Sequence, residues 1–283
     1  MRVTGYARPE ILATTDWLAE TLRRGEIRII DARWRPDGSG LAVHARGHIP
    51  GAVHVDWTVD LVELDDETGV VRLAGPERVG AAIRATGISD GMTVIVYDDT
   101  NGLHAARVWW TLRAYGLDSA RILDGGYPAW IAEELPVSNA SALPQPGSFT
   151  PRAQLRATLA TSDVRLLLGS DSVVLADARA PAEYLGHEGT SRRLGHIPGA
   201  VNLPAGYLTS PGGQRLRPAS ELRSILSKAG LARTGRRIVC YDASGVGAAR
   251  LAFVLLLMGH DDVAVYDGGW AEWGERLDLP VDR

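Results

Sequence analysis

Short apolar runs alternate with longer amphipathic segments along the whole chain. The apolar runs are bounded by polar turn residues, which is typical of strands buried in a parallel sheet. They lie at residues 27–30, 94–97, 120–123, 173–175, 238–241 and 263–266. Helices are predicted at residues 76–86, 105–115, 218–229 and 248–258. Strands that alternate with helices favour right-handed crossovers, so we predict an α/β fold of mainly parallel sheets flanked by helices.

The same order of motifs occurs twice. Asp-Ala-Arg ends one strand in each half, and Gly-His-Ile-Pro-Gly-Ala-Val, Tyr-Asp, Ala-Ala-Arg and Asp-Gly-Gly follow in that order. The two sets begin at residues 31, 47, 97, 105 and 124, and at residues 177, 195, 241, 248 and 267. A repeat about 145 residues long is far longer than a solenoid repeat, so it indicates two similar domains.

A segment rich in Pro, Ser and Asn separates the two halves. Residues 136–151 have the composition of a linker that runs over the surface. We therefore divide the chain into an N-terminal domain at residues 1–138, a linker at 139–151 and a C-terminal domain at 152–283.

Composition and charge exclude several classes of protein. The 283 residues carry a net charge of −4, without the basic excess expected of a nucleic-acid-binding protein. The longest apolar run, residues 251–258, is far shorter than the ~20 residues of a membrane span. No apolar signal segment is present in residues 1–20. A single cysteine, Cys240, excludes an intrachain disulfide and a paired-Cys zinc site, and it favours a cytoplasmic setting.

Neither a metal nor a cofactor is predicted. The seven histidines show no metal-ligand spacing, and no glycine-rich nucleotide motif follows a strand.

The segment after the second Tyr-Asp is the first candidate for a site, because ligands of such folds bind at the carboxyl ends of the strands. A turn that leads into a helix N-terminus points several backbone N–H groups at one spot and favours an anion. A small anionic molecule is therefore the expected ligand. The loop consists of Asp242, Ala243, Ser244, Gly245, Val246 and Gly247.

Taken together, these motifs resemble the two-domain rhodanese family of sulfurtransferases, of the thiosulfate and 3-mercaptopyruvate type. The resemblance implies two rhodanese-like domains, of which only the second is catalytic, and a small anionic or sulfur-containing molecule as ligand. It also implies a loop cysteine that becomes a persulfide, commonly within Cys-Gly-Ser-Gly-Val-Thr. Counting back from Ser-Gly-Val puts Asp242 at the position of this nucleophile. The internal repeat agrees, because it pairs Asp242 with Asp98 and Cys240 with Val96. We expect Cys240 to be a buried strand residue.

A second departure concerns the charge that would hold an anionic substrate. The resemblance implies a substrate-binding Arg four residues after Asp-Ala-Arg, where this chain has Glu183. Arg192 and Arg193, on the same connection, are candidates to supply the missing charge. By the same resemblance, Trp34 would line the cleft between the domains.

Three hypotheses for function follow. A carboxylate cannot accept a sulfane sulfur. The first hypothesis is therefore a sulfurtransferase relative without efficient persulfide chemistry. The second is an enzyme of another type that uses Asp242 as base or nucleophile. The third hypothesis is an active sulfurtransferase whose native cysteine was replaced in this sequence. A purely structural role for Asp242, as the N-cap of the following helix, is compatible with the first hypothesis.

Overall fold

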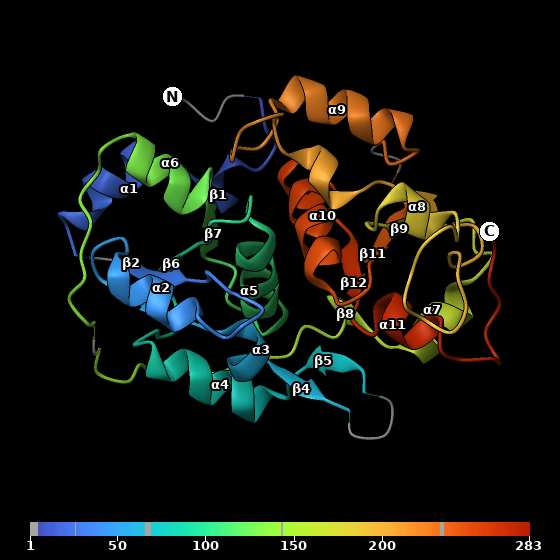
Figure 1. The fold of residues 1–283 in the computed structure, drawn as a ribbon, viewed down its shortest axis with the longest axis horizontal. Coiled ribbons are helices and arrows are strands. Elements are labelled where there is room, and N and C mark those ends of the chain that lie inside the picture. Colours follow the sequence, from blue (N-terminus) through green and yellow to red (C-terminus); the bar gives the residue numbers. More distant parts are fainter. Residues whose placement is uncertain (1–4, 26, 66–68, 143, 233–234) are drawn as a thin grey trace.

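The structure is a computed structural model that describes residues 5–25, 27–65, 69–142, 144–232 and 235–283. Two five-stranded parallel sheets form the centres of the two halves (Figure 1). The first sheet has the order β1 (Leu12–Ala13), β7 (Ala120–Leu123), β6 (Thr93–Tyr97), β2 (Ile27–Asp31) and β3 (Ala52–His54). The second has the order β8 (Thr158–Leu159), β12 (Val263–Tyr266), β11 (Arg237–Tyr241), β9 (Val173–Asp177) and β10 (Val201–Asn202).

The strand order matches between the halves, so the repeat in the sequence is a repeat of topology. The predicted α/β fold is confirmed. The domain limits at residues 138 and 152 stay a prediction, although the described residues between Ala132 and Thr158 form no helix and no extended strand.

Helices cover both sheets. In the first half these are α1 (Thr15–Leu22), α2 (Gly40–Arg46), α3 (Trp57–Asp60), α4 (Pro76–Ala85), α5 (Leu103–Ala114) and α6 (Gly126–Ala132). In the second half they are α7 (Thr161–Leu167), α8 (Pro181–Tyr184), α9 (Ala219–Lys228), α10 (Val246–Leu257) and α11 (Gly269–Trp273). Short 3₁₀ helices, η1 (Pro9–Ile11) and η2 (Ala205–Leu208), and an antiparallel hairpin of β4 (Val62–Leu64) and β5 (Val71–Leu73) complete the described elements.

The predicted helix ends differ most at α5 and α10. Both helices begin two residues earlier than predicted, directly after Gly102 and Gly245, which have φ angles of 77° and 83°. Only glycine adopts this conformation at little cost, so each glycine ends the loop and starts the helix. The apolar pattern does not contain this information.

The two halves meet along α5 and α10, which lie side by side at the centre of the molecule (Figure 1). The Trp109 ring of α5 packs edge-on against the Phe253 ring of α10, with the centroids 4.9 Å apart. Every α10 residue from Gly247 to Leu257 is buried. A helix that is apolar over most of its surface must be covered on most sides, here by its own sheet and by the other half. Within the described residues, no helix combines the length and the apolar character that a membrane crossing requires.

Candidate active site

Asp242 lies at the carboxyl edge of the second sheet, directly after β11. Its side chain is buried, at 8% exposure, while Ala243 is exposed and Ser244 and Val246 are half-buried. Gly245 and Gly247 are buried. The predicted loop therefore presents its Ala243–Ser244 corner to the outside and keeps the Asp242 carboxylate inside.

The Asp242 carboxylate fills the spot at which the loop N–H groups converge. Gly245 N donates to Oδ1 at 2.5 Å, and Gly247 N donates to Oδ2 at 2.8 Å. The prediction of Asp242 as the N-cap residue is wrong in position, because Gly245 is the N-cap of α10. Its carboxylate still performs the chemical task of a cap by accepting N–H groups of the first turn.

Asp98 does the same in the first half. Its carboxylate accepts N–H groups from Thr100 at 3.0 Å, Gly102 at 2.8 Å and Ala105 at 2.9 Å, ahead of α5. The two loops are thus built on one plan, with an Asp carboxylate inside each.

Burial dominates the electrostatics of Asp242. It raises the pKa of this carboxyl above its ordinary value, while the N–H groups of Gly247 and Gly245 and the charge of Arg107 act in the opposite direction.

Arg107 reaches the loop from the other half of the molecule. It belongs to α5, is fully buried, and donates from Nη1 to Asp267 Oδ1 at 2.7 Å. A Cβ added to Gly245 would lie 2.5 Å from the same Nη1, so the guanidinium packs against the N-cap glycine. The backbone N–H of Leu73, in β5, also donates to Asp267. Through these two hydrogen bonds, Asp267 links the first half to the Asp-Gly-Gly turn of the second.

The Asp98 loop of the first half has a matching contact with the second half. Arg250 of α10 lies against Gly102, where an added Cβ would be 2.6 Å from its Nη1, and Leu216 N donates to Asp124 Oδ1 at 2.9 Å. This role of Arg107 and Asp267 was not predicted from the sequence. The repeated Ala-Ala-Arg, which supplies Arg107 and Arg250, was the available signal.

Cys240 lies inside β11, between Ala176 of β9 and Val265 of β12. Its exposed fraction is 0%, and burial raises the pKa of the thiol far above its ordinary value. The expectation of a buried strand cysteine is confirmed.

We expect Cys240 to react at least roughly 100-fold more slowly with a thiol reagent in the folded protein than in denaturant, because labelling requires an opening of the core. The rate of reaction with 5,5′-dithiobis(2-nitrobenzoate), with and without denaturant, measures this. Rapid stoichiometric labelling of the native protein would contradict the burial.

The remaining predicted residues lie around the second domain and in the first. Glu183 Oε2 accepts the N–H of Ala180 at 3.2 Å, at the start of α8. Arg193 donates to the carbonyls of Leu279 at 2.6 Å and Trp273 at 2.9 Å, so its guanidinium holds the chain after α11.

Arg192 is exposed, and its backbone N–H donates to Glu275 Oε1 at 2.8 Å. Trp34 is half-buried among aromatic rings of the first half, 6.0 Å from Trp57 and 5.3 Å from His104 between centroids. No hydrogen bond or ion pair joins any of these side chains to the Asp242 carboxylate in the described part of the chain. Their role in a site stays a prediction.

Comparison with known proteins addresses the family. A model of the rhodanese-like domain matches this chain twice, at residues 14–133 and 160–276. The chain belongs to the rhodanese family. The motif-based expectation of two tandem rhodanese-like domains is therefore confirmed.

The similarity to other rhodanese-family proteins covers nearly the full chain. The SseB protein of Mycobacterium tuberculosis is 37% identical over 289 residues, which cover 98% of both chains. The 3-mercaptopyruvate sulfurtransferase of Escherichia coli K12 is 34% identical over 276 residues, covering 94% of this chain and 96% of the relative. The crystal structure of SseA from Escherichia coli, a 3-mercaptopyruvate sulfurtransferase, superposes with a TM-score of 0.82 at 32% identity, covering 92% and 98% of the two chains.

Proposed function

We propose that this rhodanese-family chain is a sulfurtransferase relative without efficient persulfide chemistry. Asp242 stands where the family has its nucleophilic cysteine, and its carboxylate accepts N–H groups that would otherwise stabilise a thiolate or persulfide. A carboxylate cannot take up a sulfane sulfur and release it. The thiol of Cys240 is fully buried inside β11, so it does not replace the missing nucleophile.

The single observation that carries this proposal is the likeness of Asp242 to Asp98. Both carboxylates accept N–H groups at the start of the helix that follows. By the family resemblance, the first domain is the non-catalytic one, and the second domain here has the same arrangement. The chain then serves as a binding or regulatory module that takes a small anionic or sulfur-containing molecule.

A second candidate, an enzyme that uses Asp242 as acid, base or nucleophile, is favoured by one observation. Burial raises the pKa of Asp242, as it does for many catalytic carboxyls. Both oxygens already accept backbone N–H groups, which lowers their basicity, and the residue is only 8% exposed. We therefore rank this candidate second. The remaining alternative, a native cysteine replaced by Asp242, is decided by the genomic codon for residue 242.

We expect the chain to form thiocyanate from thiosulfate and cyanide no faster than a protein-free control, because no thiol lies at the loop position. The assay is the colorimetric measurement of thiocyanate, with bovine thiosulfate sulfurtransferase as the positive control. Cyanide-releasable sulfur on Cys240 after incubation with thiosulfate would contradict the proposal.

A further inference from the structure

The loop at residues 242–247 is held from two sides. On one side, Trp270 N of the Asp-Gly-Gly turn donates to the Asp242 carbonyl at 2.7 Å, and a Cβ added to Gly269 would clash with the same oxygen. On the other side lies the Arg107 guanidinium, where a Cβ added to Gly245 would be 2.5 Å from Nη1 and 3.1 Å from Cζ. Arg107 belongs to α5, so the first half supplies one wall of this loop.

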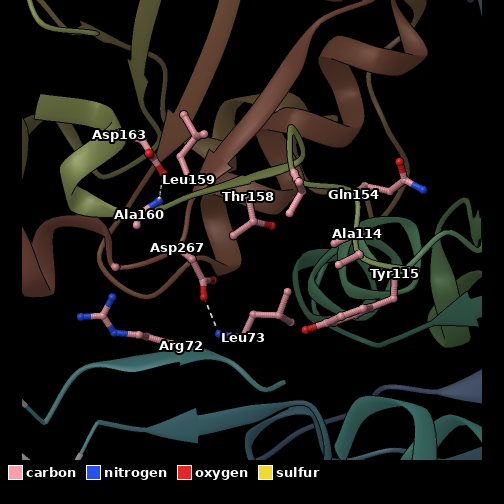
Figure 2. A pocket seen from close by; sticks show the side chains of 13 residues that line it. Arg72, Leu73, Ala114, Tyr115, Gln154, Thr158, Leu159, Ala160, Asp163 and Asp267 are labelled. Carbon is pink, nitrogen blue, oxygen red and sulfur yellow. Dashed lines mark hydrogen bonds between the residues drawn. The ribbon is translucent and has the colours of Figure 1, made fainter. Parts of the chain in front are cut away.

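A buried ion pair fixes the guanidinium in this place. Arg107 Nη1 donates to Asp267 Oδ1 at 2.7 Å, and the other oxygen of Asp267 accepts the N–H of Leu73. Figure 2 shows the bond between Leu73 and Asp267 beside a cavity of about 390 Å³ that residues of both halves line. Because both members of the pair are buried and the bond is charge-assisted, Arg107 has little freedom to turn away from the loop.

The ion pair presents its positive end to the loop. From the position of a Cβ added to Gly245, Arg107 Nη1 is 2.5 Å away and Asp267 Oδ1 is 3.3 Å away. Arg107 Nε and Nη2 are also buried, and neither has a hydrogen-bond partner in the described residues. In a buried setting of low dielectric constant, such a charge acts on its surroundings without direct contact.

Charged groups from three elements act on the Asp242 carboxyl. Burial raises the pKa of Asp242; among the charged groups, Arg107 of α5 lowers this pKa and Asp177, at the end of β9, raises it. Asp267, in the turn after β12, adds negative charge on the side of Arg107. Among these groups, Arg107 is the cation that offsets the carboxylates.

The internal repeat shows that the fold does not require this arrangement. Arg250 of α10 is the counterpart of Arg107, and it lies against Gly102 of the first loop. Asp124 is the counterpart of Asp267, but in the described residues it lies 3.6 Å from Arg215 Nη1. The second loop therefore has its arginine fixed by an ion pair with the neighbouring turn, and the contact at the first loop is built differently.

We infer that Arg107 is a positioning residue of the candidate active site, which holds the loop in its anion-accepting shape and supplies positive charge to it from the first half. The inference rests on the proposed function, because it concerns the anion preference of the same loop. It implies that the loop stabilises an anion more strongly while α5 and α10 are packed together than it would in a separated second half.

The test follows the titration of the native Asp242 carboxyl in the full chain, by the ¹³C shift of its side-chain carboxyl carbon. Arg107→Met removes the charge and should raise the pKa of Asp242 by about 0.5 pH unit or more. Arg107→Lys keeps the charge and should recover at least about half of that rise. An unchanged midpoint in Arg107→Met, or equal midpoints in the Met and Lys variants, would overturn the inference.

Asp267→Asn separates the charge of Arg107 from its packing. This change removes a carboxylate from the same pair, so it should lower the pKa of Asp242. A purely structural role of the pair would instead move the midpoint in the same direction as Arg107→Met. A rise in Asp267→Asn would therefore contradict the inference, and this measurement decides the matter if Arg107→Met does not fold.

Arg250→Met is the matched control. It removes a buried arginine from the repeat-related helix, where the side chain lies against the other loop. It should leave the midpoint of Asp242 within about 0.2 pH unit, because the charge lost is farther from this carboxyl. Equal rises in Arg107→Met and Arg250→Met would show only a general loss of packing and would overturn the inference. The titration does not depend on sulfur transfer, so its failure is distinguishable from a failure of the proposed function in the thiocyanate assay.

Discussion

Asp242→Cys should convert the loop into a reactive thiol site. The N–H groups of Gly245 and Gly247, which now reach the carboxylate at 2.5 and 2.8 Å, would face the sulfur. The usual thiol pKa is about 8.5, and sites at helix N-termini commonly have values between about 3.5 and 7.5. We expect a midpoint below about 7.5, measured as the rate of iodoacetamide labelling against pH.

Ala243→Cys is the matched control for this measurement. It places a thiol one residue further along the same loop at an exposed position, outside the converging N–H groups. Its midpoint should remain near about 8.5. Equal midpoints for the two thiols would mean that the loop N–H groups do not favour a thiolate. That outcome would remove the basis for describing the loop as an anion site.

Sulfur transfer should return in part with the same substitution. Loss of a nucleophile costs an enzyme on the order of 10⁶-fold in kcat, so we expect thiocyanate formation by Asp242→Cys to exceed that of the unsubstituted chain by about 10²-fold or more. Adding Glu183→Arg should raise it further, because a cation would replace an anion on the connection after β9. Glu188→Arg, an exposed position on the same connection, makes the same charge change as a control. Equal gains from both would show only a general effect of charge.

Arg107→Met should destabilise the protein by about 3–5 kcal/mol, as expected when one partner of a buried ion pair is removed. The Arg107–Asp267 bond joins the two halves at 2.7 Å, and both residues are buried. Removal of the guanidinium leaves the Asp267 carboxylate without its cation in a setting of low dielectric constant. The free energy of unfolding, from urea denaturation followed by tryptophan fluorescence, measures the loss.

A double-mutant cycle separates this pair from the packing around it. The double variant Arg107→Met with Asp267→Asn should be more stable than the sum of the two single losses predicts, because no unpaired charge then remains. Asp118→Ala is the control, since it breaks the exposed Arg113–Asp118 pair and should cost at most about 1 kcal/mol. Strictly additive losses at residues 107 and 267 would contradict a coupled buried pair.

The fold was largely predictable because its signals are local and occur twice. Each strand of four or five residues is a compact apolar run, such as Val263–Tyr266, and two copies of the same pattern reduce the chance of a wrong interpretation. The repeat also aligned Asp242 with Asp98 and placed Cys240 inside a strand. The structure bears out the burial of Cys240, because a continuous apolar run such as β11 is typical of a strand covered on both faces of its sheet.

The first residues of the helices and the contacts of the loop were harder to predict from the sequence. Gly102 and Gly245 begin their helices through a left-handed backbone conformation, which an apolar pattern does not encode. The partners of Arg193 likewise depend on where the chain after α11 returns, some 80 residues further along. A sequence shows that an arginine is present, while its hydrogen-bond acceptors are set by chain positions that only the folded molecule brings together.

The sequence alone determined the α/β class, the two-fold repeat, the position of Asp242 in the loop, and Cys240 as the single thiol. Each of these depends on residue identity or on short-range periodicity. Tertiary structure alone decided that the Asp242 carboxylate is enclosed by the N–H groups of its own loop. It alone showed that Arg107 crosses from the first half to Asp267, and that residues of both halves line a common cavity. The last two features arise where α5 packs on α10 and where β5 meets the Asp-Gly-Gly turn. They join residues up to 194 positions apart, and no local pattern specifies such contacts.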